Sequence, residues 1–356
     1  MMRNMSFRLA IVFFWSVVII GSIYFLAFYS QKSVQNSLNI FIWSKTIDFT
    51  CIRKFQKETG IKINTSYYES NEELLGKLEN NTDNGYDLIL PSDYAVEKMI
   101  QKGMLQEIDI TRINCFKHID PRLVHNYFDP HNQYSLPYFW GVYSIIVNKQ
   151  YYKNVDGTDK NIPNSLQLVF DPMLIEHSVC MPRNAREIAM LASWYLFGDT
   201  ANICLLDKKE AIKKLLIEQK PFVAAYGDEI VEYCLLSHSA GAALALTTDY
   251  LSVRKKIDQL ELIIPKEGVF AVIDSFVVPK NSEKKELVYK FLNYLYQEDN
   301  LRHHCEKFGV YSPLKKVQNK TIYVSAVENA QLRFFNADSP KQLHCFDDIW
   351  LSLMSN

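Results

Sequence analysis

Segments with strand-like and helix-like patterns alternate along the first third of the chain, and this alternation limits the possible folds more than any other feature. Three short apolar runs have the length of strands: 38–43, 61–68 and 86–91. Three further segments carry apolar residues at helical spacing: 50–59, 70–80 and 93–102. Gly60 and Ser70 stand where a helix end and a helix start would be capped. This β-α-β-α-β-α order predicts a parallel sheet with right-handed crossovers, so the fold class is α/β.

Residues 162–275 contain a second set of such segments, which predicts a second lobe. In the chain after residue 137, strands are predicted at 138–148, 241–247, 261–264 and 270–279, and helices at 185–197, 207–217 and 282–297. The runs 138–148 and 270–279 are long enough to leave one lobe and enter the other. The predicted division of the chain is lobe 1 from 38–145 plus roughly 275–310, and lobe 2 from 146–274 plus roughly 311–356.

The N-terminal segment predicts export from the cytoplasm. Arg3 and Arg8 precede the run 9–29, which contains no charged residue and is 21 residues long. A helix of that length spans about 30 Å, the thickness of a bilayer core. Because the positive flank is N-terminal, the rest of the chain is expected outside the cytoplasmic membrane. Two alternatives stay open: a cleaved signal peptide within 1–30, or an uncleaved anchor at 9–29.

Composition excludes several classes of function. The chain has 356 residues and a net charge of −1, with bases and acids mixed along its length, so no nucleic-acid surface is expected. The G-x-S-x-G, P-loop, G-x-G-x-x-G and H-E-x-x-H motifs are all absent from the sequence. The seven Cys are scattered without a C-x-x-C pair. We therefore predict no enzyme, no cofactor and no metal site.

Two predicted strands end in residues suited to binding a small molecule. The strand at 38–43 ends at Trp43 and Ser44, and the strand at 86–91 is followed by Ser92, Asp93 and Tyr94. In an open α/β sheet, ligands bind just past the carboxyl ends of the strands. Aromatic faces attract ammonium ions, so Trp43 and Tyr94 are candidates for a cation site. The alternatives are core packing for both rings, and a helix N-cap role for Asp93.

Two carboxylates are further candidates. Asp274 lies inside the apolar run 269–279, where a charge is costly unless it is paired. It would serve either as a counter-ion for a cationic ligand or in a buried salt bridge or turn. Glu187 follows Asn184 by three residues, which is close to a capping box and offers a purely structural role. Arg186, the residue before Glu187, is expected to be a solvated helix residue.

Several stretches carry a resemblance to a known family. They are FQKETGIK at 55–62, YESNE at 68–72, YDLILPSDY at 86–94, FDP at 128–130, YSLPYFWG at 134–141, NARE at 184–187, PKEG at 265–268 and DS at 274–275. In these stretches the chain resembles the periplasmic spermidine/putrescine-binding proteins of bacterial polyamine ABC transporters. The resemblance runs from about residue 38 to beyond 310.

The resemblance implies a two-lobed, type II periplasmic-binding-protein-like fold with the ligand in a cleft between hinged lobes. It also implies a monomer in the periplasm, tethered by 9–29 if that segment is uncleaved, that delivers a polyamine to an inner-membrane ABC permease. The implied ligand-binding residues are Trp43, Ser44, Ser92, Tyr94, Asn184, Glu187 and Asp274. Carboxylates would bind the amines, and aromatic rings would face the methylene chain.

The chain departs from the family at several of these positions. Thr46, Val272 and Val310 stand where the family has aromatic rings, and Leu246 or Thr247 stands where it has another; Asn184 replaces an Asp, and Lys45 an acid. The site is therefore expected to bind a polyamine more weakly or to prefer another small cation. Ferric iron is a further alternative, although the adjacent Tyr67 and Tyr68 would point to opposite faces of a strand. Rivals of another class are an enzyme or a membrane-tethered sensor on a two-lobed fold.

Overall fold

The computed structural model describes residues 15–22, 36–80, 85–227, 230–318, 325–328, 330–335 and 340–355. Residues 15–22 are helical, and within the described ranges no helix is long and apolar enough to cross a membrane. Most of the predicted apolar segment 9–29 lies outside these ranges, so the choice between anchor and signal peptide stays a prediction.

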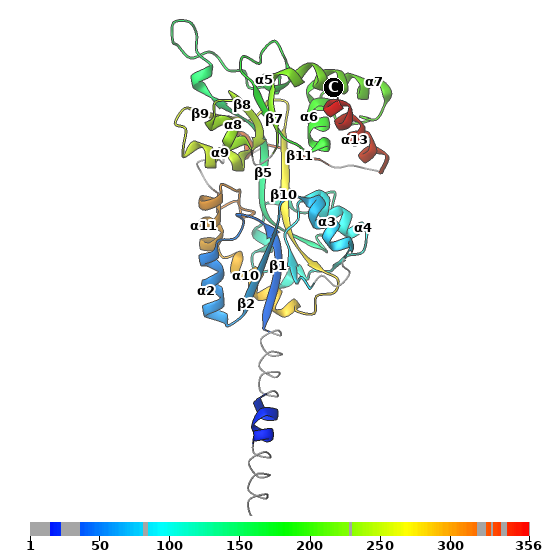
Figure 1. Ribbon diagram of the computed structural model, residues 1–356, viewed down its shortest axis with the longest axis vertical. Helices are drawn as coiled ribbons and strands as arrows, with labels where there is room; N and C mark the ends of the chain where they lie inside the picture. The colour runs from blue at the N-terminus through cyan, green and yellow to red at the C-terminus, as the bar shows by residue number, and fades with distance from the viewer. Residues whose placement is uncertain are drawn as a thin grey trace, which may run out of the picture.

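The chain forms two lobes stacked along its long axis (Figure 1). The elements of lobe 1 are β1 (Ser37–Trp43), α2 (Phe49–Thr59), β2 (Lys62–Tyr68), α3 (Asn71–Asn80), β3 (Leu88–Ile89), α4 (Asp93–Gln101), β4 (Leu105–Gln106), α10 (Lys285–Leu295) and α11 (Glu298–Phe308). Those of lobe 2 are α5 (Gln167–Phe170), β6 (Val179–Met181), α6 (Ala185–Phe197), α7 (Leu206–Gln219), β7 (Val223–Tyr226), α8 (Val231–Leu236), β8 (Ala242–Leu246), α9 (Thr247–Arg254), β9 (Leu260–Ile263), β11 (Leu332–Phe334) and α13 (Pro340–Ser355).

Two long strands run through both lobes. These are β5 (Ser135–Asn148), which is buried along its whole length, and β10 (Val269–Pro279). They pair antiparallel, with Ala271 opposite Val142 and Val277 opposite Ser135, and the register shifts between Asp274 and Ser275. The predicted strands 138–148 and 270–279 are thus confirmed, within the longer strands β5 and β10.

The sheet order is β2-β1-β3-β10-β5-β8-β6-β7. The predicted parallel pairing is confirmed for β1 with β2 and with β3, and β6 is parallel to both β7 and β8. The two crossing strands make the sheet mixed, because β10 is antiparallel to β3 and β5 is antiparallel to β8. Parallel neighbours bring the carboxyl ends of β1 and β3 to the same edge of the sheet, facing lobe 2.

Local sequence explains the first helices of lobe 1. In α2, Ile52 and Phe55 are buried against the sheet, and the helix ends at Gly60 with φ +70°. That left-handed conformation favours glycine, and the Gly60 N–H donates to the Gln56 carbonyl at 2.9 Å. The hydroxyl of Ser70 accepts the Glu73 N–H at 3.1 Å and caps α3 as predicted.

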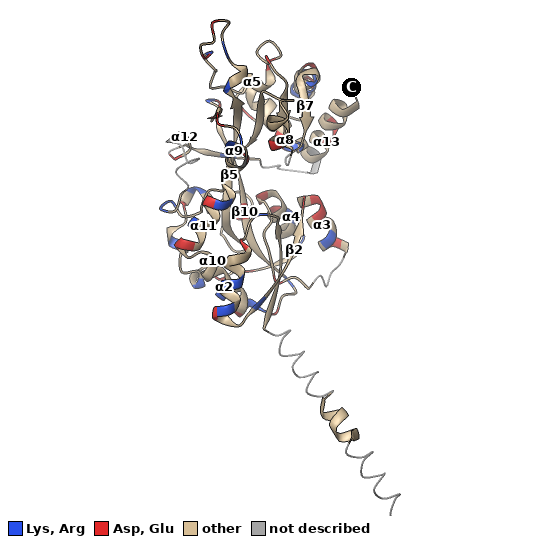
Figure 2. Cartoon of the chain, turned by 60° about the vertical axis from the view of Figure 1, so that its left-hand side comes forward, with Lys and Arg blue, Asp and Glu red and all other residues tan. Residues whose placement is uncertain are grey.

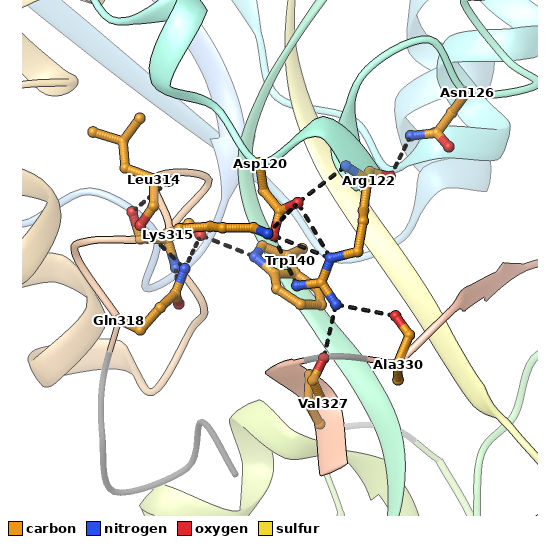
Figure 3. Close-up of polar contacts among 10 residues, drawn as sticks. Asp120, Arg122, Asn126, Trp140, Leu314, Lys315, Gln318, Val327 and Ala330 are labelled. Atoms are coloured by element: carbon orange, nitrogen blue, oxygen red, sulfur yellow. Dashed lines mark hydrogen bonds and ion pairs between the residues drawn. The ribbon is translucent and has the colours of Figure 1, made fainter. Parts of the chain in front are cut away.

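A third connection returns the chain to lobe 2, and an arginine of lobe 1 holds it (Figure 3). Both carboxylate oxygens of Asp120 accept hydrogen bonds from Arg122, at 2.7 to 3.2 Å. Nη1 of Arg122 donates to the Val327 and Ala330 carbonyls at 2.8 and 3.1 Å. The guanidinium also lies 5.5 Å from the Trp140 ring. One side chain therefore ties α12 (Ser325–Glu328) to the strand that crosses between the lobes.

We expect Arg122→Met to lower the free energy of unfolding by about 3 kcal/mol, because it leaves the fully buried Asp120 carboxylate without its guanidinium. Urea denaturation would measure the change. Arg112→Met is a matched control, since Arg112 makes a two-point contact with the exposed Glu286 at 2.7 Å. An exposed pair of this kind contributes about 1 kcal/mol or less. Equal losses in the two variants would contradict the role of burial.

Candidate ligand-binding cleft

A cavity of about 450 Å³ lies between the lobes and is lined by residues of both. All seven of the predicted ligand-binding residues are in its wall: Trp43, Ser44, Ser92, Tyr94, Asn184, Glu187 and Asp274. Lobe 1 supplies the ends of β1 and β3 and the start of α4, lobe 2 supplies the start of α6, and β10 passes between them. The structure brings these residues together, and their roles toward a ligand stay predictions.

The first turn of α6 places two of them. Oδ1 of Asn184 accepts the Arg186 and Glu187 N–H groups at 3.1 and 3.3 Å, so Asn184 is the N-cap of the helix. The Glu187 carboxylate is buried and accepts a short hydrogen bond from the Tyr143 hydroxyl of β5. The Asn184 side chain thus helps to start the helix, while Glu187 is held on the cleft wall by a second element.

Asp274 is half-buried on β10 beside Ser92. The Ser92 hydroxyl donates to Asp274 Oδ1 at 2.7 Å, and the two residues also form an isolated antiparallel bridge. Burial raises the pKa of Asp274 to about 7; the Ser92 hydrogen bond opposes this rise, and the neighbouring Asp93 adds to it. The groups that act on this carboxyl are a neutral hydroxyl and another acid, so a cation would be favoured beside it.

Asp93 is not the N-cap of α4, and that interpretation was wrong. Ser92 occupies the N-cap position with extended backbone, while Asp93 is the first helical residue and is completely buried. Its Oδ1 accepts the Tyr94 N–H at 2.7 Å, and its Oδ2 has no hydrogen-bond partner among the described residues. Burial raises the pKa of Asp93 to about 6, and attraction to Arg186 limits the rise.

The two aromatic candidates differ in how much of each ring is already engaged. Trp43 packs 4.4 Å from the buried Tyr68, and within the described residues its Nε1 is buried without a hydrogen-bond partner. The Tyr94 hydroxyl donates to Glu72 Oε1 at 2.5 Å, and its ring lies 4.1 Å from the Arg186 guanidinium and 5.4 Å from Lys98 Nζ. The Tyr94 ring is thus already in contact with basic side chains of the protein, whereas the Trp43 ring forms an apolar part of the cavity wall.

Sequence reasoning missed four carboxylates of the cleft. Glu69 and Glu72 follow β2, and Glu232 and Asp249 lie on α8 and α9. The first two stand at the carboxyl end of a predicted strand, so the rule that selected Trp43 would have found them. Glu232 and Asp249 lie on short helices that were not predicted.

The wall of the cleft is strongly acidic. Six carboxylates line it: Glu69, Glu72, Glu187, Glu232, Asp249 and Asp274. Among the described residues of the wall, Lys45 is the one basic side chain. Figure 2 shows acidic positions on α3 of lobe 1 and α8 of lobe 2, where the lobes face each other. Such an excess favours a cationic ligand over an anionic one.

The residues predicted to stand in place of the family's aromatic rings lie in the wall of the cavity. Val272 and Val310 line the cavity, as does Thr46, whose hydroxyl donates to the Trp43 carbonyl at 2.7 Å. Tyr68 is buried and Tyr67 exposed, which confirms that they face opposite sides of β2. No group of three or more His, Cys, Asp or Glu within the described ranges is arranged to hold a metal ion.

Comparisons with known proteins agree with this architecture. The model of the bacterial extracellular solute-binding protein family matches residues 50–331. The chain belongs to this family. It is 31% identical over 284 residues to the spermidine/putrescine-binding periplasmic protein of Salmonella typhimurium, covering 80% of this chain and 79% of that protein. It is 26% identical to a putrescine-binding periplasmic protein of Escherichia coli, covering 92% and 93%.

Solved structures confirm the two-lobed fold of this solute-binding protein. A putative spermidine/putrescine ABC transporter protein from Listeria monocytogenes aligns with a TM-score of 0.75 at 29% identity, covering 90% of this chain and 99% of that one. An iron-bound protein from Pseudomonas aeruginosa aligns with a TM-score of 0.66 at 14% identity, covering 90% and 98%, and shares the fold alone.

The raised pKa of Asp274 predicts a pH-dependent stability. An unfolded Asp titrates near pH 4, so between about pH 4 and 7 the folded protein keeps a proton that the unfolded chain has lost. The free energy of unfolding should therefore fall as pH rises through this range, by up to about 1.4 kcal/mol per pH unit. Asp274→Asn should remove this contribution. Urea denaturation at several pH values would measure the free energy of unfolding of both proteins. The same dependence on pH in wild type and in Asp274→Asn would contradict the prediction.

Proposed function

We propose that this solute-binding protein is the extracytoplasmic subunit of an ABC importer that captures putrescine or spermidine between its lobes. The observation that carries the proposal is the acidic cleft, in which six carboxylates and one Lys share a wall with Trp43. Ammonium groups of a polyamine would pair with the carboxylates through charge-assisted hydrogen bonds.

The arrangement of the carboxylates supports a ligand with more than one positive charge. Asp274 with its Ser92 partner lies on one side, and Glu187 with its Tyr143 partner lies on α6 of lobe 2. Each carboxylate is oriented by a hydroxyl donor, so little side-chain freedom would be lost on binding. The methylene chain of the ligand would lie against Trp43 and the apolar wall that includes Val272.

The names of the relatives support the remaining parts of the proposal. Proteins described as periplasmic and polyamine-binding suggest the periplasm as the location and an inner-membrane ABC permease as the partner. We further propose that the protein is a monomer without catalytic activity, and that residues 9–29 tether it to the membrane if they are not cleaved. The lobe boundaries near 145 and 274 are part of the same proposal.

A second candidate is a different small organic cation in the same cleft. The resemblance implies aromatic rings, which would cover a methylene chain, at the positions of Val272, Val310 and Thr46, and Lys45 adds a positive charge to the wall. These substitutions favour a shorter or more polar cation than spermidine, and ligand preference would separate the two candidates.

Calorimetric titration of the purified protein with putrescine and then spermidine tests the proposal. We expect binding at micromolar or lower concentration, weakened by about 1.5–3 kcal/mol in Asp274→Asn because a hydrogen bond to a charged group is lost. Asp258→Asn, at an exposed position of lobe 2, is the control and should bind as wild type does. Absence of heat and of thermal stabilisation with both amines would reject a polyamine ligand.

The variant Trp43→Ala tests whether the Trp43 ring contacts the ligand or belongs to the core. We expect it to weaken binding of the amine while leaving the unfolding midpoint within a few degrees of wild type, since Trp43 is only partly buried. Thermal denaturation without ligand, alongside the titration, measures both effects. A large loss of stability without ligand would instead assign Trp43 to the core that contains Tyr68.

A further inference from the structure

Arg186 lies in the first turn of α6, on lobe 2, between two residues of the cleft wall. The expectation of a solvated side chain was wrong, because only 6% of Arg186 is exposed. A buried guanidinium needs partners that compensate for its lost hydration. The residues that contact the Arg186 guanidinium must therefore stabilise its charge even when no ligand is bound.

The partners of Arg186 belong to the other lobe. Its guanidinium lies 4.1 Å from the centre of the Tyr94 ring, a cation–π contact to the first turn of α4 in lobe 1. The next residue toward the N-terminus, Asp93, is completely buried and attracted to Arg186. Asp93 Oδ2 has no hydrogen-bond partner within the described ranges, so the positive charge of Arg186 is its main compensation.

Opening the cleft would break these contacts. Arg186 moves with α6 and lobe 2, whereas Tyr94 and Asp93 are fixed to α4 and lobe 1. Separation would remove the cation from the Tyr94 ring and take from the buried Asp93 the positive charge that stabilises it. The Tyr94 hydroxyl donates to the cleft carboxylate Glu72 within lobe 1. Arg186 therefore contacts a ring that also orients a residue of the cleft wall.

We propose that Arg186 is a closing latch: a positioning residue of lobe 2 that docks on Tyr94 and Asp93 of lobe 1, stabilises the closed form, and slows escape of the cation bound beside it. Its role in ligand escape rests on the proposed function of the cleft, whereas its role in closure does not. The guanidinium is a cation of the protein itself that already contacts the Tyr94 ring, which leaves Trp43 as the aromatic ring available to the ligand.

Distance measurement between the lobes tests closure without any ligand. Spin labels on noncanonical residues at Tyr67 of lobe 1 and Met173 of lobe 2, both exposed, leave the native cysteines unlabelled. We expect Arg186→Met in the full chain to shift the distance distribution toward the open form. Arg53→Met is the matched control, because Arg53 lies 4.4 Å from the exposed Phe49 ring within lobe 1 and should leave the distances unchanged. Identical distributions in wild type and Arg186→Met would overturn the latch.

Stopped-flow dissociation of putrescine tests retention of the ligand. We expect Arg186→Met to release it about 3- to 30-fold faster, the range for losing a cation–π contact, and Arg186→Lys to recover part of the loss. If Arg186→Met does not fold, Tyr94→Leu removes the same contact from lobe 1 and should open the lobes likewise. An unchanged dissociation rate with opened lobes would reject the retention role. If wild type binds no polyamine, the proposed function fails while the distance measurement still decides the latch.

Discussion

The antiparallel pairing of β5 with β10 is the interaction on which the rest of the structure depends. Both strands continue from one lobe into the other, and β5 is buried at every residue. Since a buried backbone must satisfy its hydrogen bonds, the two lobes share one mixed sheet and cannot fold with unrelated orientations. The register shift beside Asp274 falls where the strands pass the cleft, which gives this carboxylate its place in the wall.

The electrostatics of the cleft follow from that shared sheet. Asp93 on α4 lies close enough to Asp274 on β10 to raise the free-energy cost of charging Asp274. Two groups, one from each lobe, offset this cost: the Ser92 hydroxyl donates to Asp274, and the Arg186 guanidinium attracts Asp93. The wall has more acidic than basic side chains, even though Glu232 is paired with Lys256, and this excess of negative charge is the physical reason for the cleft to favour a cation.

Much of the fold and of the cleft could be predicted, because the helices and strands of lobe 1 have clear periodicity and the cleft residues follow strand ends. The short strands β6 and β7 and the helices α8 and α9 gave no signal, since three to eight residues are too few to show a period. Glu232 and Asp249 were missed for that reason. Arg186 was misassigned because its first-turn position cannot reveal a partner more than 90 residues earlier in the sequence.

The first turn of α6 concentrates three tasks in four residues. Asn184 starts the helix, Arg186 joins the lobes, and Glu187 lines the cleft. Substitutions in this stretch will alter affinity and exchange rate together, because the helix cannot shift one side chain without moving the others. Ligand preference should therefore change more readily through substitutions elsewhere in the cleft wall, at Trp43 or Val272. Such substitutions do not affect the contact between the lobes, so the rates of ligand binding and release would be preserved.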